Sequence, residues 1–333
     1  MKSNDEFEYK VITRNSKEKY FAALLENAAY IHKREKDTLD WLKWKYFESP
    51  FGESICIVAL TKDNKIAGEV TFGQYQYILN NKTIKCLISY QTMVHPNHQK
   101  KGLFSSLTKE ALKIAKTKGI ELVLNFPNKD SYAPFEKLNF YPINHIDNKV
   151  FLVMKISTLI NILSLKKPFL ATIIHEVSEK QLLLFNELKN TITPLRIKDT
   201  LTPNRTPEFI KWRYFTFPLY DYRIIKTSLG WSIVRLGKRG VVNEVQIMEM
   251  FPITIFNYEF IQKIKHKIIA ELKPNIILCN ISNNHPAERF IKKSGFYALP
   301  HKISFFTFAI NNHFANLLKK EIWIVTATEF HRY

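Results

Sequence analysis

The sequence predicts an α/β protein made of two tandem domains, each an α+β mixed sheet flanked by helices. Three observations support this prediction. The chain has 333 residues, and domains average roughly 150 residues. Helical and strand-like periodicities alternate along the chain. Two short aromatic segments recur in the same order in both halves, which is the mark of an internal repeat.

Two pairs of segments define the repeat. The sequence DWLKWKYFESP around Trp44 resembles EFIKWRYFTFP around Trp212, and EKLN before Phe140 resembles KKSG before Phe296. The tryptophans are 168 residues apart and the phenylalanines 156, so the second copy is 12 residues shorter between these points. The expected domains therefore span residues 1–156 and 157–333.

Periodicity assigns the elements of each copy. In the first copy, apolar residues at helical spacing predict helices at 20–32, 39–47, 104–118 and 131–138. Alternating apolar residues predict strands at 54–60, 66–76, 83–94, 121–126 and 149–156. Asp63-Asn64 marks the turn of a hairpin, Pro96 follows the end of a strand, and Gly119 is placed to end a helix.

The second copy follows the same order. Helices are expected at 207–215, 258–272 and 286–293, and strands at 222–228, 231–237, 243–251, 275–279 and 301–309. Residues 157–206 are expected to form a linker and the first helix of this copy.

Composition excludes several classes of protein. The three cysteines, Cys56, Cys86 and Cys279, are far apart and form no CxxC or His/Cys cluster. Neither a disulfide framework nor a metal site is expected. The polar, acidic first ten residues do not resemble a secretory signal. The apolar run 150–165 is shorter than the ~20 residues of a membrane span, so a cytoplasmic protein without a membrane span is expected.

The chain is strongly basic, with a net charge of +19. Residues 1–150 carry +6 and residues 151–333 carry +13. Such a charge attracts anions, including nucleic acid and phosphorylated molecules, but it is equally compatible with a solvated lysine-rich surface. The sequence holds no recognised nucleic-acid-binding motif, and most of its cations are lysines, so nucleic acid is an unfavoured partner.

The strongest chemical signal is the segment MVHPNHQKKGLF, from Met93 to Phe104. A strand there is predicted to run through a short basic loop into an amphipathic helix. Such a junction presents unpaired backbone N–H groups and the positive end of a helix, which together bind phosphates. Gly102 lets the backbone approach an anion closely. The alternative is an ordinary helix N-terminus with solvated lysines.

This segment and its surroundings resemble the GCN5-related N-acetyltransferase (GNAT) superfamily. The order strand, V-x-P-x-x-Q-x-x-G loop, helix and strand is that of the family, followed by Asn128 and a short helix that ends in Asn-Phe. Phe104 departs from the small residue usual at its position. Two-domain members, resembling Eis-type and sugar-cluster acetyltransferases, are the nearest match. The resemblance is strongest over residues 54–145.

The resemblance implies that acetyl-CoA is bound as co-substrate in the first domain. The residues it assigns to acetyl-CoA are Met93, Val94, Gln99, Lys100, Lys101, Gly102, Leu103, Phe104, Asn128 and Ser131. Asn128 is equally suited to cap the helix that follows it. After Phe251 the second copy has neither a glycine nor a cationic pair, so this copy is expected to be degenerate and to lack an acetyl-CoA site.

Catalytic groups are less well defined. Many family members protonate the leaving thiolate with a tyrosine at the position of Phe135, and Tyr132, one helical turn earlier, is the predicted substitute. Packing in the core is its alternative role. His95 and His98 flank the loop and are weaker candidates for a base. In Eis-type enzymes the terminal carboxylate reaches the active site, so by resemblance the remaining candidates are Glu329, His331 and the carboxylate of Tyr333. Their alternative role is a final strand packed on the second domain.

The sequence therefore predicts an N-acetyltransferase that moves acetyl from acetyl-CoA to a primary amine of a small molecule, by direct attack in a ternary complex. The acceptor is expected to be an amino sugar or another amine, including an anionic one. Two alternatives stay open. One is an acyltransferase with a longer acyl donor, and the other is a non-catalytic protein that binds a CoA thioester or nucleic acid.

Overall fold

The computed structural model describes residues 6–32, 38–153, 169–171, 177–216, 220–315 and 322–329. The chain forms two compact units, and each is described by itself. Unit 1 comprises Met1–Asn144 and Ser304–Lys320, and unit 2 comprises His145–Ile303 and Glu321–Tyr333. No helix in the described part of the chain is long and apolar enough to cross a membrane.

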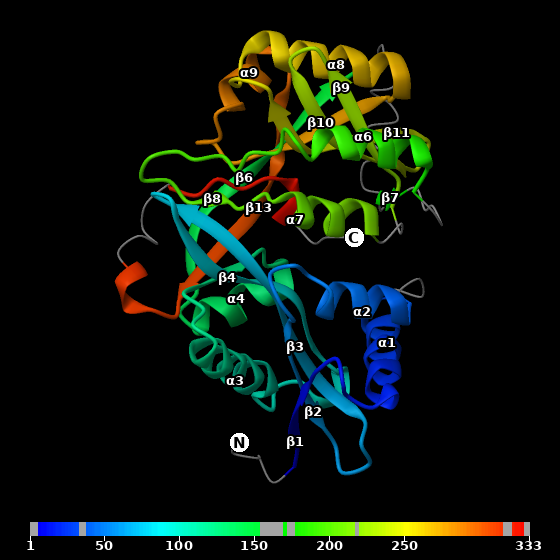
Figure 1. Cartoon of the computed structure of the whole chain (residues 1–333). Coiled ribbons are helices and arrows are strands. Elements are labelled where there is room, and N and C mark those ends of the chain that lie inside the picture. The colour runs from blue at the N-terminus through cyan, green and yellow to red at the C-terminus, as the bar shows by residue number, and fades with distance from the viewer. Residues whose placement is uncertain are drawn as a thin grey trace. The chain divides into compact units, whose positions relative to one another are not determined.

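Unit 1 is a mixed sheet covered by helices on both faces (Figure 1). Its helices are α1 (Glu18–His32), α2 (Leu39–Phe47), α3 (Leu103–Thr117) and α4 (Lys129–Lys137). Its strands, in spatial order, are β1 (Glu8–Ile12), β2 (Ile55–Leu60), β3 (Ile66–Leu79), β4 (Lys82–Val94), β5 (Leu122–Asn125) and the end of β13 (Tyr297–Ala309). Only β4 and β5 among these neighbours are parallel.

The helix α3 shows why this sequence makes these layers. Leu103, Leu107, Ala111 and Ala115 recur at helical spacing, and all four are buried in the core of unit 1. They pack on the inward face of β2 and β3, which contributes residues such as Ile57. The helices α1 and α2 lie on the other side of the sheet (Figure 1), which leaves the two faces of β4 in different surroundings.

Unit 2 repeats the element order of unit 1. Its helices are α6 (Glu179–Leu188), α7 (Pro207–Lys211), α8 (Tyr258–Leu272) and α9 (Glu288–Lys293), with a π-helical turn at Trp212–Thr216 after α7. Its main strands, in spatial order, are β6 (Tyr141–Leu152), β12 (Ile276–Asn280), β11 (Val242–Pro252), β10 (Gly230–Arg239) and β9 (Tyr222–Thr227). Strand β7 (Phe169–Ala171) also pairs with β10, and β11 with β12 is the parallel pair.

The closing strands are exchanged between the two halves of the sequence. From the sequence, the strand 149–156 is expected in the first domain and the strand 301–309 in the second. In the structure, Asn148–Leu152 of β6 pair with β12 of unit 2, and Phe306–Ala309 of β13 pair with β5 of unit 1. The expected boundary at residue 156 therefore differs from the observed units. Both strands follow the same short helix and Phe-Tyr ending, so local pattern does not specify which sheet each one joins.

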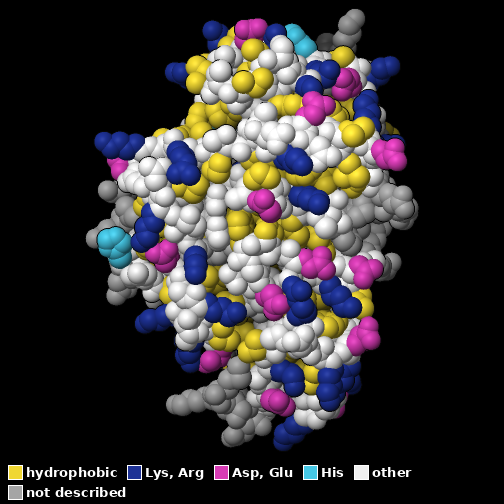
Figure 2. Space-filling model, in the orientation of Figure 1, with side chains coloured by type: hydrophobic (Ala, Val, Ile, Leu, Met, Phe, Trp, Pro, Cys, Tyr) yellow, Lys and Arg dark blue, Asp and Glu magenta, His cyan; other side chains and the backbone are white. Residues whose placement is uncertain are grey.

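The exposed face drawn in Figure 2 reflects the basic composition. Lys and Arg side chains are scattered over it and interspersed with Asp and Glu, rather than gathered in one patch. This distribution is that of a solvated basic surface.

Candidate functional site

In unit 1 the strands β4 and β5 stop pairing partway along β4. The two strands pair from Cys86 with Leu122 to Ile88 with Leu124. Beyond this point β4 continues to Val94 along β3 alone, with an irregularity in the register between Thr71 and Phe72. In an open sheet with parallel strands, ligands bind at the carboxyl ends of strands that separate in this way.

The loop after β4 leads into an uncapped helix. A 3-10 turn at Pro96–His98 is followed by Lys100 and Gly102 with φ of 63° and 77°, and α3 begins at Leu103. Gly102 is the N-cap residue and supplies no side-chain cap. A Cβ at Gly102 would meet no atom within 4 Å, so the backbone here is open to an incoming group.

The backbone amides of this junction have no partners in the described structure. Ser106 is the first residue of α3 whose N–H bonds within the helix, to the carbonyl oxygen of Gly102 at 3.0 Å. No described group accepts a hydrogen bond from the amides of residues 100–105. Six donors at the positive end of a 15-residue helix are suited to the oxygens of a pyrophosphate.

The predicted loop residues differ in whether their side chains can contact a ligand. Lys100 is exposed, whereas Lys101 pairs with the carboxylate of Glu6 and lies 5.6 Å from the ring centroid of Phe7. The side-chain nitrogen of Gln99 donates to the carbonyl oxygen of Val94 at 3.4 Å. The loop side chains therefore tie the loop to its surroundings, and the main chain offers the larger set of donors.

Two of the predicted residues extend into the core behind the loop. Leu103 is buried, and the ring of Phe104 packs edge-on against Phe135 at 4.9 Å between centroids. The contact between these two rings explains why both Phe104 and Phe135 depart from the family pattern. The large ring at 104 rests against the phenylalanine that stands in the usual place of tyrosine.

Asn128 and Ser131 form a capping box at the start of α4. The Asn128 side-chain oxygen accepts from the Ser131 amide at 2.9 Å, and the Ser131 hydroxyl accepts from the Asn128 amide at 3.1 Å. The capping role considered for Asn128 is therefore present. Tyr132 is half-buried against Phe306, at 4.6 Å between ring centroids, and no described group hydrogen-bonds its hydroxyl.

Sequence reasoning missed a carboxylate beside the end of β4. Glu69 of β3 is the direct partner of Met93, and its side chain is fully buried. Its Oε1 accepts from the hydroxyls of Tyr46 and Thr71, each at 2.9 Å. Burial, and then the charge of Glu69, hold the pKa of Tyr46 well above its usual value, so this phenol stays protonated. A search confined to β4 overlooks Glu69, although its polarity within a buried strand is a signal in itself.

The predicted C-terminal residues fall into two groups. Glu329 is fully buried in unit 2, where it accepts from Arg205 Nη2 at 2.5 Å and from the Thr326 amide at 2.7 Å. This bonding favours a structural role for Glu329. His331 and Tyr333 lie outside the described residues. The expected final strand is reduced to isolated bridges on unit 2 and a 3-10 turn at Ala327–Glu329.

Unit 2 lacks the equivalent junction. Its loop between β11 and α8 has five residues, 253–257, against the eight of 95–102 in unit 1. Asn257 caps α8, since its side-chain oxygen accepts from the Phe260 amide at 2.8 Å. The loop contributes only part of the 12-residue shortening, and the shorter strands β10 and β11 contribute more.

Comparisons with known proteins address the family and the fold. Residues 12–141 match the family model described as an acetyltransferase (GNAT) domain. No curated protein matches the sequence. Solved structures share the fold over nearly the whole chain, at identities that establish the fold alone.

Three of these structures match similar shares of the chain. A GCN5-related N-acetyltransferase from Anabaena variabilis has a TM-score of 0.61 at 9% identity, covering 92% of this chain and 73% of that one. Eis1 from Mycobacterium abscessus has a TM-score of 0.56 at 8% identity, and the match covers 94% of this chain and 76% of that one. N-myristoyltransferase from Saccharomyces cerevisiae, with bound myristoyl-CoA, has a TM-score of 0.55 at 10% identity, and the match covers 92% of this chain and 80% of that one. Residues 12–141 thus form a GNAT acetyltransferase domain, as expected of an acyltransferase whose co-substrate is an acyl-CoA, and the chain as a whole shares its fold with Eis1.

Proposed function

We propose that the chain transfers acetyl from acetyl-CoA to the primary amine of a small molecule, by direct attack of the amine in a ternary complex. The observation that carries this proposal is the set of uncommitted amides at residues 100–105, beside the gap between β4 and β5. Amino sugars are the first acceptors to test. The co-substrate supplies an activated acyl group as a thioester, and the protein supplies binding, orientation and proton transfer.

Binding and orientation are assigned to the main chain of unit 1. The amides from Lys100 to Ser105 are proposed to hold the pyrophosphate, with Gly102 allowing its close approach. The end of β4 at Met93 and Val94 is proposed to orient the thioester carbonyl. Since β5 no longer pairs with β4 beyond Ile88, these main-chain groups are not committed to that strand.

An assay of CoA thiol release with a panel of amines tests the activity. Acetyl-CoA with an amino sugar or an aliphatic amine is expected to give saturable release that depends on both substrates. Release that is unchanged by any amine would contradict the transfer. Acetyl-CoA, octanoyl-CoA and myristoyl-CoA compared in the same assay address donor length, and we expect acetyl-CoA to have the highest kcat/KM.

Tyr132 is proposed to protonate the leaving thiolate. Its hydroxyl has no hydrogen-bond partner among the described residues, and its ring is fixed against Phe306. Tyr132→Phe keeps the ring and removes the proton donor, so kcat is expected to fall about 100-fold while the KM for acetyl-CoA changes little. Tyr297→Phe, on an exposed tyrosine of unit 2, is the control. Equal kcat in Tyr132→Phe and wild type would assign Tyr132 a packing role only.

Glu69 is proposed to accept the proton of the attacking amine, with the Tyr46 hydroxyl as relay. The carboxylate lies beside Met93 on the sheet face that Tyr46 of α2 covers. Glu69→Gln keeps the shape but removes the base, so we expect kcat to fall about 100-fold and the acidic limb of the kcat–pH profile to disappear. A variant that keeps this limb would show that another group is the base.

A further inference from the structure

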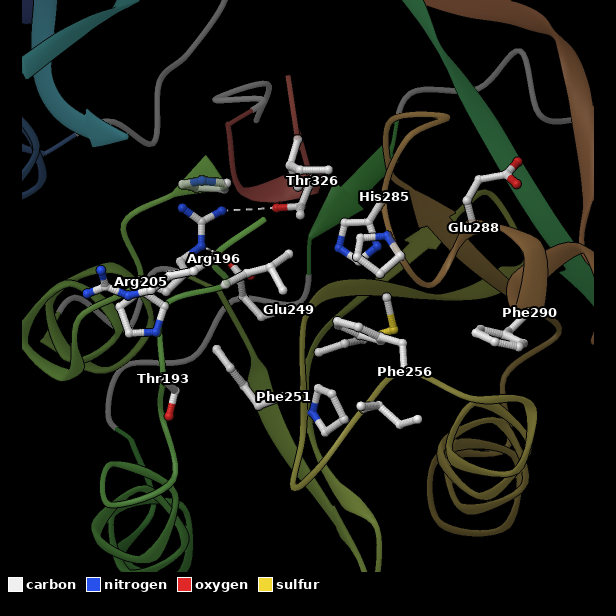
Figure 3. A pocket seen from close by; sticks show the side chains of 18 of the residues that line it. Thr193, Arg196, Arg205, Glu249, Phe251, Phe256, His285, Glu288, Phe290 and Thr326 are labelled. Atoms are coloured by element: carbon white, nitrogen blue, oxygen red, sulfur yellow. Dashed lines mark hydrogen bonds and ion pairs between the residues drawn. The ribbon is translucent and has the colours of Figure 1, made fainter. Parts of the chain in front are cut away.

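Unit 2 contains a pocket at the end of β11, the strand that corresponds to β4 of unit 1. The pocket has a volume of about 920 Å³ and is lined by residues of unit 2 alone. Strands β11 and β12 pair in parallel from Glu244 to Ile247 and then separate. The end of β11, the loop that follows it, the 283–290 segment and the 191–196 segment form the walls (Figure 3). A pocket of this size is sufficient for a small organic ligand.

The pocket is unsuited to a second CoA. The loop has five residues and no glycine, and the Asn257 side chain at its end accepts from the Phe260 amide. The open glycine with positive φ at which the unit 1 backbone can approach a pyrophosphate therefore has no counterpart among residues 253–257. The second copy has kept the separation of the two parallel strands and lost the glycine and the lysine pair of the loop, so a different ligand has to be considered.

The walls combine apolar side chains with an excess of cations. Phe251 and Phe256 line the interior, and Ile253 and Ile255 lie at the rim with 60% and 67% of their surface exposed. Exposed aliphatic side chains beside a pocket are costly in water and favour an apolar ligand.

The carboxylates that line the pocket already have cationic partners. Glu249 pairs with Arg205 at 2.5 Å, and Glu288 pairs with Lys292 at 2.7 Å and with the buried Lys149 at 3.7 Å. The exposed Arg196 and Arg289 bring two more guanidinium groups to the walls. The pocket consequently has a positive balance, which favours an anionic ligand.

His285 provides a polar contact inside the pocket. Its side chain is 7% exposed and packs edge-on against Phe256 at 5.2 Å (Figure 3). Its Nδ1 accepts from the Ala287 amide at 3.0 Å, so the neutral ring carries its proton on Nε2. Burial, together with Lys149 and Arg205, lowers the pKa of His285 to about 3. No described residue accepts from Nε2, which leaves one donor for a ligand.

We propose that this pocket of unit 2 binds an apolar monocarboxylate, with its hydrocarbon part against Phe251, Phe256 and the rim isoleucines. The carboxylate is recognised by the Nε2–H of His285 and the guanidinium groups of the walls, since guanidinium pairs with carboxylate in a fork geometry. A single carboxylate needs few donors, in contrast to a pyrophosphate. The site is separate from the acyl-CoA site of unit 1 and is not part of the proposed acetyl transfer.

Calorimetric titration of the full chain with octanoate tests the proposal. We expect saturable binding of one octanoate per chain, with octylammonium and octanol at least about tenfold weaker. Octylammonium binding as tightly as octanoate, or no saturable binding of octanoate, would overturn the proposal.

Variants at one rim position test the role of charge. Ile255 is largely exposed, so charged residues are tolerated there by the fold. Ile255→Glu is expected to weaken octanoate binding at least about tenfold, whereas Ile255→Lys is expected to preserve it. Val241→Glu, on a 71% exposed residue of unit 2 that does not line the pocket, is the control and should bind as wild type. Equal binding by both Ile255 variants would exclude the pocket.

A further variant tests His285 itself. His285→Asn keeps an acceptor for the Ala287 amide, since an Asn oxygen makes the same contact two residues along the chain, but it removes Nε2. Octanoate affinity is expected to fall about tenfold. Gly102→Val is the complementary control, because octanoate binding should survive in it. If octanoate binds as expected while acetyl-CoA does not bind the wild type, only the proposed acetyl transfer fails.

Discussion

Replacing Gly102 with valine is expected to abolish acetyl-CoA binding and lower kcat/KM at least about 100-fold, the loss that follows when two charge-assisted hydrogen bonds are removed. Gly102 has a φ of 77°, and its Cβ position faces open space. A β-branched residue there both strains the backbone and fills the space in front of the free amides. Thermal unfolding with and without acetyl-CoA measures the binding, and thiol release measures kcat/KM.

Gly119 provides a matched control. It has a φ of 69°, its Cβ would also meet nothing within 4 Å, and it follows the other end of α3. Gly119→Val therefore imposes a similar strain of roughly 1–2 kcal/mol without touching the loop. Both variants should unfold at similar temperatures, but only Gly119→Val should be stabilised by acetyl-CoA. Loss of binding in both would mean that strain, rather than obstruction of the loop, explains the result.

Replacing Arg205 with methionine is expected to reduce the stability of unit 2 by about 3–5 kcal/mol. Arg205 pairs with both Glu249 and Glu329, at 2.5 Å in each case, and the three side chains are at most 5% exposed. Without the guanidinium, two carboxylates stay buried with no shared cation. Urea denaturation measures the free energy of unfolding. Arg289→Met, at an exposed arginine of the same unit, is the control and should change it little.

The pH dependence of this loss has a defined sign. Burial raises the pKa of Glu249, while Arg205 opposes the shift and Glu329 adds to it. In Arg205→Met the opposition is lost, so the pKa rises further. A carboxyl whose pKa is raised by folding contributes stability that is full below its unfolded pKa and is lost as pH rises through its folded pKa. The deficit of Arg205→Met should therefore shrink as pH falls from 7 toward about 4.5. A constant deficit would mean that the carboxylates are not its cause.

The same cluster affects how the C-terminal prediction has to be tested. Deleting residues 329–333 removes a carboxylate that pairs with Arg205, so lost activity in that variant would also follow from a destabilised unit 2. Deleting only His331, Arg332 and Tyr333 keeps Glu329 in place. This shorter deletion separates a catalytic role of the terminal residues from the structural role of Glu329.

Elements with strong local signals could be predicted from the sequence. Helix α8 (Tyr258–Leu272) has the predicted limits, and α3 (Leu103–Thr117) differs from its predicted limits by one residue at each end. In both, apolar spacing defines the buried face. Strand β1 (Glu8–Ile12) was missed because it is short and lies next to a polar terminus. The partners of β6 and β13 could not be predicted, since pairing across the repeat depends on contacts far apart in the sequence.

The candidate site was predictable to a similar degree. The glycine loop followed from its motif, because backbone donors at a helix N-terminus are recognisable from residue order. Glu69 was missed because its relevance depends on its register with Met93. The pocket of unit 2 was also missed, since the sequence there shows the absence of the glycine loop but does not show the space beside the end of β11.

The central claim is that one acyl-CoA site exists, in unit 1, formed by the main chain around Gly102. Calorimetric titration with acetyl-CoA tests it most directly through the stoichiometry. We expect one acetyl-CoA per chain in the wild type and in Gly119→Val, and no binding in Gly102→Val. Two acetyl-CoA molecules per chain, or undiminished binding by Gly102→Val, would contradict the account.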